Sequence, residues 1–397
     1  MISVGIDVSK GKSTVCILKP GGEVLRPPFE INHTADELGT LVDLIKSFDE
    51  EIRVVLEDTG HYHLPVVVPL VERGIFVCCI NALRMKKFCS QSLRRAKTDK
   101  IDSIKIANFG LAYWSELTPT LPTNEIYHEL KLLARQYYQT VSLLIKAKVN
   151  LSNLLDQTMP DIQTVLADNK SNSKLTDFVA RYYHYDHILK MGEQNFTRDY
   201  CAWAKEKGYR LNERKAAQIF ALAQNGIPTL PNSVSTQIAV SEAVKLIRSI
   251  TESRNTILTQ MQKFCKSLPE YFIVKDMPCI GDTLAPRIIA EIGDVRRFKN
   301  KHSLVAYAGI DAPPFQSGAF NASQRHISKR GNSYLRKTAF EIMQSLIQHK
   351  PNGDPVYDFV QKKRSEGKSA KESMVAGINK FLRVYYGKVM ELYSTAA

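Results

Sequence analysis

The fold of the N-terminal part is decided by the stretch ISVGIDVSKGKSTVCIL, which spans residues 2–18. Two apolar or alternating runs, residues 2–7 and 13–19, flank the compact turn Ser9-Lys10-Gly11-Lys12. Runs of strand length joined by so short a turn predict a β-hairpin. Asp7 then lies near the end of the first strand.

Strand and helix signals alternate after this hairpin. A third strand is expected at residues 24–31, and Pro27-Pro28 restricts it to a sheet edge or a bulge because proline cannot donate to a strand ladder. Thr34 is a favoured N-cap for the helix that follows. Residues 52–57 form an apolar strand that ends in carboxylates, and a further strand is expected at 75–80. This order predicts an α/β domain over residues 1–115.

The middle of the chain, residues 124–268, has the heptad pattern of long helices, with a helical insert over 161–230. Apolar residues recur there at alternating steps of four and three. The first series is Ile126, Leu130, Leu133, Tyr137, Thr140, Leu144, Ala147, Leu151 and Leu154, and the second is Val240, Ala243, Ile247, Ile250, Arg254, Ile257, Met261, Phe264 and Leu268. These helices either pair within one chain as an antiparallel hairpin or form a dimerising coiled coil, and the sequence leaves both alternatives open.

A third domain, mostly helical, is expected over residues 270–397. It begins with Met277-Pro278-Cys279-Ile280-Gly281 ahead of a short helix from Ala285 to Ile292. This arrangement is typical of a helix–hairpin–helix, which offers backbone N–H groups to phosphate. Residues 296–337 are dense in Arg and Lys and contain a glycine-rich loop.

Composition points to nucleic acid as the partner. The chain of 397 residues carries a net charge of +14, with a pI near 9.3, and such a surplus favours a polyanion. A membrane is a weaker candidate, since no apolar run approaches the ~18 residues needed to span one. The seven cysteines are odd in number and show no CxxC spacing. We therefore expect reduced thiols, no zinc knuckle and a cytoplasmic, nucleoid-associated protein.

Four carboxylates could form a metal site. Asp7 and Glu57 each lie at a strand end, and a helix capped by Thr98 places Asp99 and Asp102 three positions apart on one face. Hard divalent cations prefer such oxygen ligands. Two ions about 3.5–4 Å apart would stabilise the attacking and leaving oxygens of a phosphodiester. Each acid alone is more often a cap or turn residue, but the four together in so basic a chain favour a Mg²⁺ site.

Basic residues surround the helical pair of acids. A cluster of six cations without an intervening acid would repel itself unless an anion binds, so backbone contact with RNA or DNA is favoured over a merely solvated face. The six are Arg84, Lys86, Lys87, Arg94, Arg95 and Lys97.

Two groups of motifs resemble one transposase family. The segments Gly5–Lys10, Leu56–Gly60 and Lys97–Asp102 look like the DEDD motif of the insertion-sequence transposases that have a RuvC-like, ribonuclease-H-type domain, a family that also includes a site-specific DNA invertase. The second group resembles the family's C-terminal transposase domain, and the two groups together cover roughly residues 1–115 and 270–395. The second group consists of Tyr307-Ala308-Gly309, Gln316-Ser317-Gly318, Ile327 to Asn332, and Leu335-Arg336.

The resemblance implies a DNA recombinase guided by a structured non-coding RNA, the bridge RNA, which pairs with target and donor DNA. Asp7, Glu57, Asp99 and Asp102 would hold Mg²⁺ or Mn²⁺, and Ser317 would form a covalent phosphoserine. Family members are thought to form tetramers in which the serine of one subunit completes the carboxylate site of another. Four cations near the serine could neutralise phosphate charge: Arg325, Lys329, Arg330 and Arg336.

Other functions remain open on the sequence. A structure-selective nuclease that resembles a Holliday-junction resolvase would use water as the nucleophile and would not need Ser317. A catalytically silent nucleic-acid scaffold is a third alternative. Tyr307 and Tyr334 are weaker nucleophile candidates, because no Arg/His constellation of a tyrosine recombinase can be placed. At Cys279 the family often has glycine, which puts the standard helix–hairpin–helix turn in question.

Overall fold

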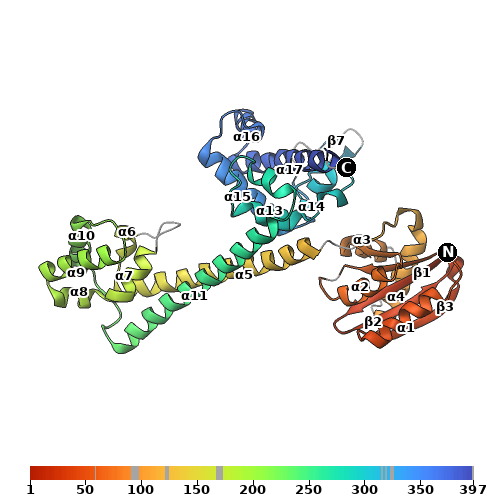
Figure 1. Cartoon of the computed structure of the whole chain (residues 1–397), viewed down its shortest axis with the longest axis horizontal. Helices are drawn as coiled ribbons and strands as arrows, with labels where there is room; N and C mark the ends of the chain where they lie inside the picture. Colours follow the sequence, from red (N-terminus) through yellow and green to blue (C-terminus); the bar gives the residue numbers. More distant parts are fainter. Residues whose placement is uncertain are drawn as a thin grey trace. The chain divides into compact units, whose positions relative to one another are not determined.

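The computed structural model describes residues 1–58, 60–90, 98–120, 125–166, 173–313, 316–317, 320–321 and 326–395. The chain divides into two compact units, Met1–Thr123 and Asn124–Ala397 (Figure 1). No helix of the described residues is long and apolar enough to cross a membrane. An N-terminal α/β part and a mostly helical remainder are confirmed, and the finer division into three domains stays a prediction.

Unit 1 contains a mixed five-stranded sheet in the order β3-β2-β1-β4-β5. The hairpin strands β1, β2 and β3 are antiparallel, whereas β1, β4 and β5 run parallel. The strands are β1 (Ile2–Ser9), β2 (Lys12–Leu18), β3 (Val24–Asn32), β4 (Ile52–Glu57) and β5 (Val77–Ile80). The expected hairpin is therefore confirmed, and Pro27-Pro28 lies in an edge strand as predicted.

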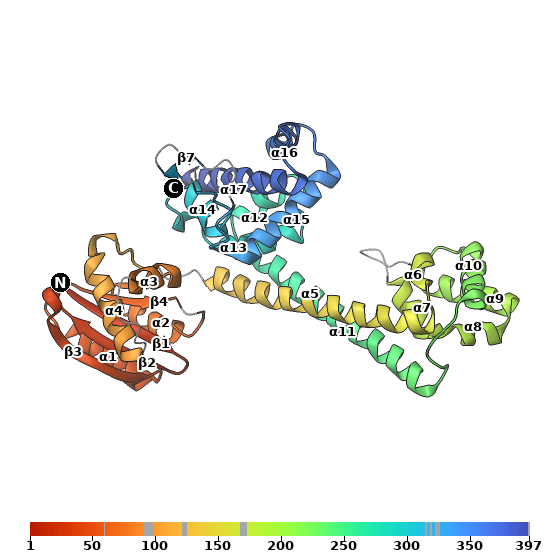
Figure 2. The same cartoon turned by 180° about the vertical axis from the view of Figure 1, so that it is seen from behind.

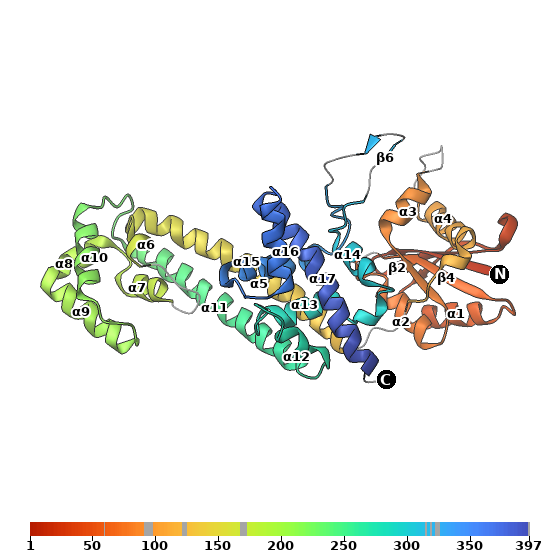
Figure 3. The same ribbon diagram turned by 90° about the horizontal axis from the view of Figure 1, so that it is seen from above.

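Helices cover both faces of this sheet (Figure 3). On one face, α1 (Ala35–Lys46) and α2 (Leu64–Glu72) pack on a core that includes Ile6 and Leu56. On the other, α3 (Ala82–Cys89) and α4 (Asp99–Ala112) pack against Val55. Successive side chains of a strand point to opposite faces. The odd-numbered residues of β1 and β4 therefore face α4.

Two glycines allow α4 to lie directly on the sheet. A Cβ at Gly5 of β1 would come within 2.3 Å of the Ala107 nitrogen and the Ser103 oxygen, and one at Gly110 of α4 within 2.2 Å of the Ser3 Oγ. Ser3 of β1 thus meets Gly110 of α4, whereas Gly5, further along the strand, meets the earlier helix residues Ser103 and Ala107. The helix therefore runs in the direction opposite to the strand. The N-terminal end of α4 therefore lies toward the carboxyl ends of β1 and β4.

Unit 2 is built on two long helices, α5 (Glu125–Thr158) and α11 (Val234–Cys265), which lie side by side (Figures 1 and 2). The first part of α5 shares a core with the last part of α11, through Leu130 and Met261. The last part of α5 shares another core with the first part of α11, through Leu151 and Val240. The helices are therefore antiparallel and pair within one chain. This is the hairpin alternative of the two that the heptads left open.

The helical insert joins the two long helices at one end. Its aromatic side chains, which include Phe178, Tyr200 and Trp203, belong to the same core as Leu151 and Val240. Its helices are α6 (Ile162–Val165), α7 (Lys174–Tyr182), α8 (Tyr185–Met191), α9 (Glu193–Glu206) and α10 (Glu213–Asn225).

The remainder of unit 2 packs on the opposite end of the α5–α11 pair. Its elements are α12 (Glu270–Lys275), α13 (Leu284–Ile292), α14 (Lys301–Ala308), β6 (Gln316–Ser317), β7 (Phe320–Asn321), α15 (Ser333–His349), α16 (Pro355–Ser365) and α17 (Ala370–Thr395). Cys279, between α12 and α13, has a φ of 65°. That left-handed conformation favours glycine, the residue that the family resemblance leads us to expect there.

We predict that Gly5→Ala lowers the free energy of unfolding of unit 1 by about 2–3 kcal/mol, because the new methyl group meets backbone atoms of α4 that cannot turn aside. Hydrogen exchange in β1 and α4 of the full chain measures the effect. Gly39→Ala in α1 is the matched control, since nothing lies within 4 Å of its Cβ position. It should stabilise by about 0.4–1 kcal/mol. Equal protection in both variants would contradict the close approach.

Candidate active site

Asp7 and Glu57 are neighbours at one edge of the unit 1 sheet. The parallel register pairs Ile6 with Leu56, so the next residues stand at matching positions: Asp7 lies two residues before the end of β1, and Glu57 is the last residue of β4. Both side chains are half-buried. By the alternation of the strands both point to the face that α4 covers.

The second pair of acids is carried to the same edge by α4. Thr98 accepts a hydrogen bond from the Ile101 amide at 3.3 Å, so the expected N-cap is confirmed and α4 begins at Asp99. Ser103 packs on Gly5. Asp99 lies one helical turn before Ser103, and Asp7 lies two residues after Gly5. Since α4 runs opposite to β1, both acids lie at the same end of the contact between the helix and the strand. Packing thus brings the backbones of both acid pairs together.

Lys105 and Cys89 also face this region. Lys105 Nζ lies 3.3 Å from Asp102 Oδ1, and both side chains are mostly buried. Burial raises the pKa of the Cys89 thiol; Lys105 opposes this, whereas Asp102 and Glu57 add to it. Glu57, Asp102 and Lys105 therefore act on one thiol and share one electrostatic environment. Lys105 is one helical turn after Asp102, a spacing that could have identified it from sequence.

The carboxylates have the right chemistry for a hard cation but are not gathered around one point. Among the described residues, no group of three or more His, Cys, Asp and Glu side chains is placed to hold a metal ion. An all-oxygen donor set still fits Mg²⁺. Binding would require Asp102 to exchange its contact with Lys105 for the ion. The metal site therefore stays a prediction.

The basic cluster of unit 1 is only partly visible. Arg84 donates to Glu116 at 2.5 Å and lies over the rings of Phe109 and Tyr113, so its guanidinium has a structural role in α3–α4 packing. Lys86 and Lys87 on α3 are exposed. The remaining three cations of the cluster, Arg94, Arg95 and Lys97, lie outside the described residues.

In unit 2, Ser317 lies in the short hairpin of β6 and β7, where it pairs with Phe320. The ends of the loop that carries it meet in a ladder that we call the loop base, formed by Tyr307–Asp311 and Ser328–Asn332. Three backbone hydrogen bonds of 2.8 to 2.9 Å form this ladder. The N–H of Asn332 donates to the Tyr307 carbonyl, that of Lys329 to the Gly309 carbonyl, and that of Ser328 to the Asp311 carbonyl. Gly331 is required there, because a Cβ would come within 2.3 Å of the Tyr307 carbonyl oxygen.

Arg336 fastens the loop base. Its Nη1 donates to the carbonyls of Ala308 at 2.9 Å and Gly331 at 3.1 Å, one on each side of the ladder. Lys329 and Arg330 are exposed, and Lys329 has a positive φ of 51°. Contact of these three cations with phosphate stays a prediction, and Arg325 lies outside the described residues.

A buried carboxylate that sequence reasoning missed supports this base. Glu291 of α13 is fully buried. Its carboxylate accepts hydrogen bonds from the Arg135 guanidinium of α5 at 2.5 Å and from the side-chain amide of Asn332 at 2.7 Å. The side-chain oxygen of Asn332, Oδ1, in turn caps α15 by accepting from the backbone N–H groups of Tyr334 and Leu335. Buried charge requires such partners. The signal in the sequence was a glutamate inside the apolar helix 284–292, one turn after Arg287.

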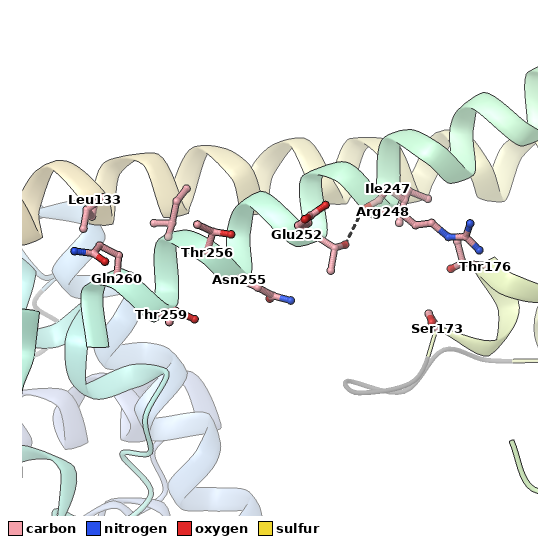
Figure 4. Close-up of a pocket in the computed structure, with 12 residues that line it drawn as sticks. Leu133, Ser173, Thr176, Ile247, Arg248, Glu252, Asn255, Thr256, Thr259 and Gln260 are labelled. Carbon is pink, nitrogen blue, oxygen red and sulfur yellow. Dashed lines mark hydrogen bonds between the residues drawn. The ribbon is translucent and has the colours of Figure 1, made fainter. Parts of the chain in front are cut away.

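A groove of about 810 Å³ along α11 is a weaker site candidate (Figure 4). Hydroxyl and amide side chains line most of it, among them Thr256, Asn255 and Gln260. Arg248 within it is held by Asp177 at 2.6 Å. The groove therefore offers little charge to a polyanion.

Comparison with known proteins agrees with this combination of parts. Residues 4–160 match a family profile described as "Transposase", and residues 272–358 match one described as "Transposase IS116/IS110/IS902 family". The chain is therefore a transposase, an enzyme that acts on DNA. It belongs to the IS116/IS110/IS902 transposase family.

Individual relatives support the assignment along the whole chain. A putative transposase y4rJ of Sinorhizobium fredii is 31% identical over 95% of this chain and 88% of its own length. The insertion element IS116 uncharacterized 44.8 kDa protein of Streptomyces clavuligerus is 22% identical over 92% of this chain and 89% of its own length. Among solved structures, T. thermophilus RuvC in complex with Holliday junction substrate matches 30% of this chain and 99% of that chain, with 13% identity and a TM-score of 0.24.

We predict that Arg336→Lys opens the loop base, because one ammonium cannot reproduce two hydrogen bonds from a single fixed guanidinium. Exchange of the Ser328 and Lys329 amides should become faster on the order of tenfold, as expected for lost charged hydrogen bonds. Lys337→Ala, at the next position of α15, is the control and should leave these amides protected. If Arg336→Lys keeps their protection, Arg336 does not fasten the loop base.

Proposed function

We propose that this transposase is an RNA-guided, Mg²⁺-dependent DNA recombinase that cuts and rejoins strands through a phosphoserine on Ser317. The observation that carries the proposal is the packing of α4 on Gly5, which places the Asp99–Asp102 end of the helix at the strand ends of Asp7 and Glu57. The RuvC-like, ribonuclease-H-type assignment of unit 1 is part of this proposal.

Asp7, Glu57, Asp99 and Asp102 would hold the metal. Bound there, Mg²⁺ would supply charge neutralisation at the phosphate and a lowered pKa for a coordinated hydroxyl. Lys105 would leave Asp102 when the ion binds and would remain as a cation beside the carboxylates. Asp7, Glu57 and Asp102 are half-buried, which limits screening by water and strengthens these electrostatic interactions, whereas Asp99 is exposed.

Ser317 would act as the nucleophile. Its Oγ would bond to phosphorus while one bond from phosphorus to a deoxyribose oxygen breaks, and the serine proton would end on the released DNA hydroxyl. Attack by a DNA hydroxyl on the phosphoserine would reverse these changes, restore Ser317 and conserve the bond energy for rejoining. The loop base would hold the ends of this segment, so that only the residues between them need to adjust.

Guide RNA and oligomerisation complete the proposal. The net charge of +14 and the exposed Lys86 and Lys87 suit a second polyanion beside DNA.

The two long helices retain exposed apolar residues outside their mutual contact, at Leu143, Ile145, Val149 and Leu246. Such residues suit a coiled-coil contact between subunits in a dimer or tetramer, which would let the serine of one subunit serve the carboxylates of another.

Substitution of the nucleophile tests the chemistry. Ser317→Ala should abolish a denaturant-resistant protein–DNA adduct and strand rejoining, because no other atom would form the covalent bond. Ser333→Ala, an exposed serine at the start of α15, is the control and should keep the adduct. Asp99→Asn should also abolish cleavage. If cleavage survives Ser317→Ala but not Asp99→Asn, water is the nucleophile and the resolvase-like alternative holds.

RNA guidance has a separate test. We predict that the protein purified from cells that carry its complete element retains one structured RNA encoded in the element's flank. Sequencing of the bound RNA, with Lys86→Gln/Lys87→Gln as a variant of reduced charge, measures this. Recovery of only random cellular RNA would reject guidance while leaving the serine chemistry untouched.

A further inference from the structure

Tyr307 of α14 lies in a strongly cationic environment that the proposed reaction does not use. Arg297 lies over its ring, 4.5 Å from the centroid, and over the ring of the neighbouring Phe298 at the same distance. Lys131, from the first turns of α5, acts electrostatically on the phenol from another element. The side-chain amide of Asn332 donates to the phenol oxygen at 3.3 Å. Three segments far apart in sequence therefore converge on one hydroxyl.

The cations at this point outnumber the carboxylates, although Arg297 also helps to lower the pKa of Asp294 and is thus partly offset by it. Arg135 is neutralised by the buried Glu291, and the nearby Asp294 is held by Arg296 at 2.7 Å. In the part of the chain that the structure describes, no carboxylate lies within ion-pair distance of Lys131 or Arg297. Both cations are exposed, so an anion from solution can reach them.

The phenol itself has hydrogen-bonding capacity to spare. The side-chain amide of Asn332 donates to its oxygen at 3.3 Å. The hydroxyl also carries a proton of its own, which it can donate to an acceptor from outside this group. Burial alone would raise the pKa of Tyr307, but Arg297, Lys131 and the Asn332 amide outweigh it and lower the pKa below the ordinary value. The cationic surroundings therefore favour an anion next to this hydroxyl.

We propose that Lys131, Arg297 and the Tyr307 hydroxyl bind one phosphate group of a nucleic-acid backbone beside the loop base. The stacked guanidinium is held in a fixed plane, and its fork suits two oxygens of a phosphodiester. Lys131 supplies a second charge and the hydroxyl a donor. Because the Tyr307 carbonyl belongs to the loop base, the bound strand would pass next to the segment that carries Ser317. The binding site rests on the family's action on DNA and not on the serine chemistry.

Salt dependence of binding tests the proposal. The full-length double variant Lys131→Gln/Arg297→Gln is compared with the wild type on a short DNA duplex of arbitrary sequence and on a short single-stranded RNA. Loss of one phosphate contact should reduce the slope of log K against log salt by about 0.9 for duplex DNA or about 0.7 for a single strand. Lys190→Gln/Lys205→Gln, which removes two exposed lysines of the insert, is the matched control and should change the slope less.

The two nucleic acids identify the source of the phosphate. A reduced slope on DNA alone assigns the site to the DNA strand, and a reduced slope on RNA alone assigns it to the guide RNA.

Tyr307→Phe removes only the hydroxyl, and should weaken binding about tenfold, as expected for a hydrogen bond to a charged group. An unchanged slope on both nucleic acids, or an equal loss in the control, would overturn the proposal.

Two further variants separate binding from folding and from catalysis. Arg297→Lys keeps the charge and should keep the slope, so a loss equal to that of the Lys131→Gln/Arg297→Gln variant would assign Arg297 to packing instead. Ser317→Ala should bind with the wild-type slope. If Ser317 proves dispensable for cleavage while the double variant still loses its phosphate contact, the serine mechanism fails and the binding site stands.

Discussion

The close approach of α4 to β1 is the constraint on which the candidate active site depends. Because Gly5 has no side chain, the backbone of β1 packs on the backbone of α4, and Gly110 of α4 leaves room for the side chains of Ser3 and Val55. The contact fixes the direction of α4 and therefore the position of its N-terminal acids. Nothing in the carboxylates themselves would draw them together, because like charges repel. Apolar packing elsewhere in unit 1 provides the free energy that holds them at one edge.

A comparable relation exists between the core of unit 2 and its serine-bearing segment. Glu291 is buried and requires partners, and these come from α5 and from the loop base. Because breaking one partner of a buried charge costs several kcal/mol, on the order of 3–5, the loop base is coupled to the long helix. The phosphate site that we propose at Tyr307 uses the same loop base. Binding of a strand and placement of the serine would thus depend on one set of contacts.

Much of unit 1 could be predicted from local sequence. The hairpin, the edge strand with Pro27-Pro28 and the caps at Thr34 and Thr98 follow from turn chemistry and periodicity over a few residues. The heptads of unit 2 predicted two long helices but not their partner, since an apolar seam is equally satisfied within a chain or between chains. Arg84 and Arg336 were assigned to phosphate by charge alone, while in the structure each makes defined contacts with the protein.

The sequence by itself determined the hairpin of unit 1, the long helices of unit 2 and the two groups of family motifs, and it named the four acids and the serine as candidates. Only the tertiary structure decided that α4 runs opposite to β1, that the two seams meet in one chain, and that Arg297 and Lys131 both act on Tyr307. These three residues lie on separate elements whose spacing in sequence carries no sign of their contact. The physical reason is that periodicity reports which face of an element is buried, whereas the partner of that face is chosen by the shape of side chains remote in the chain.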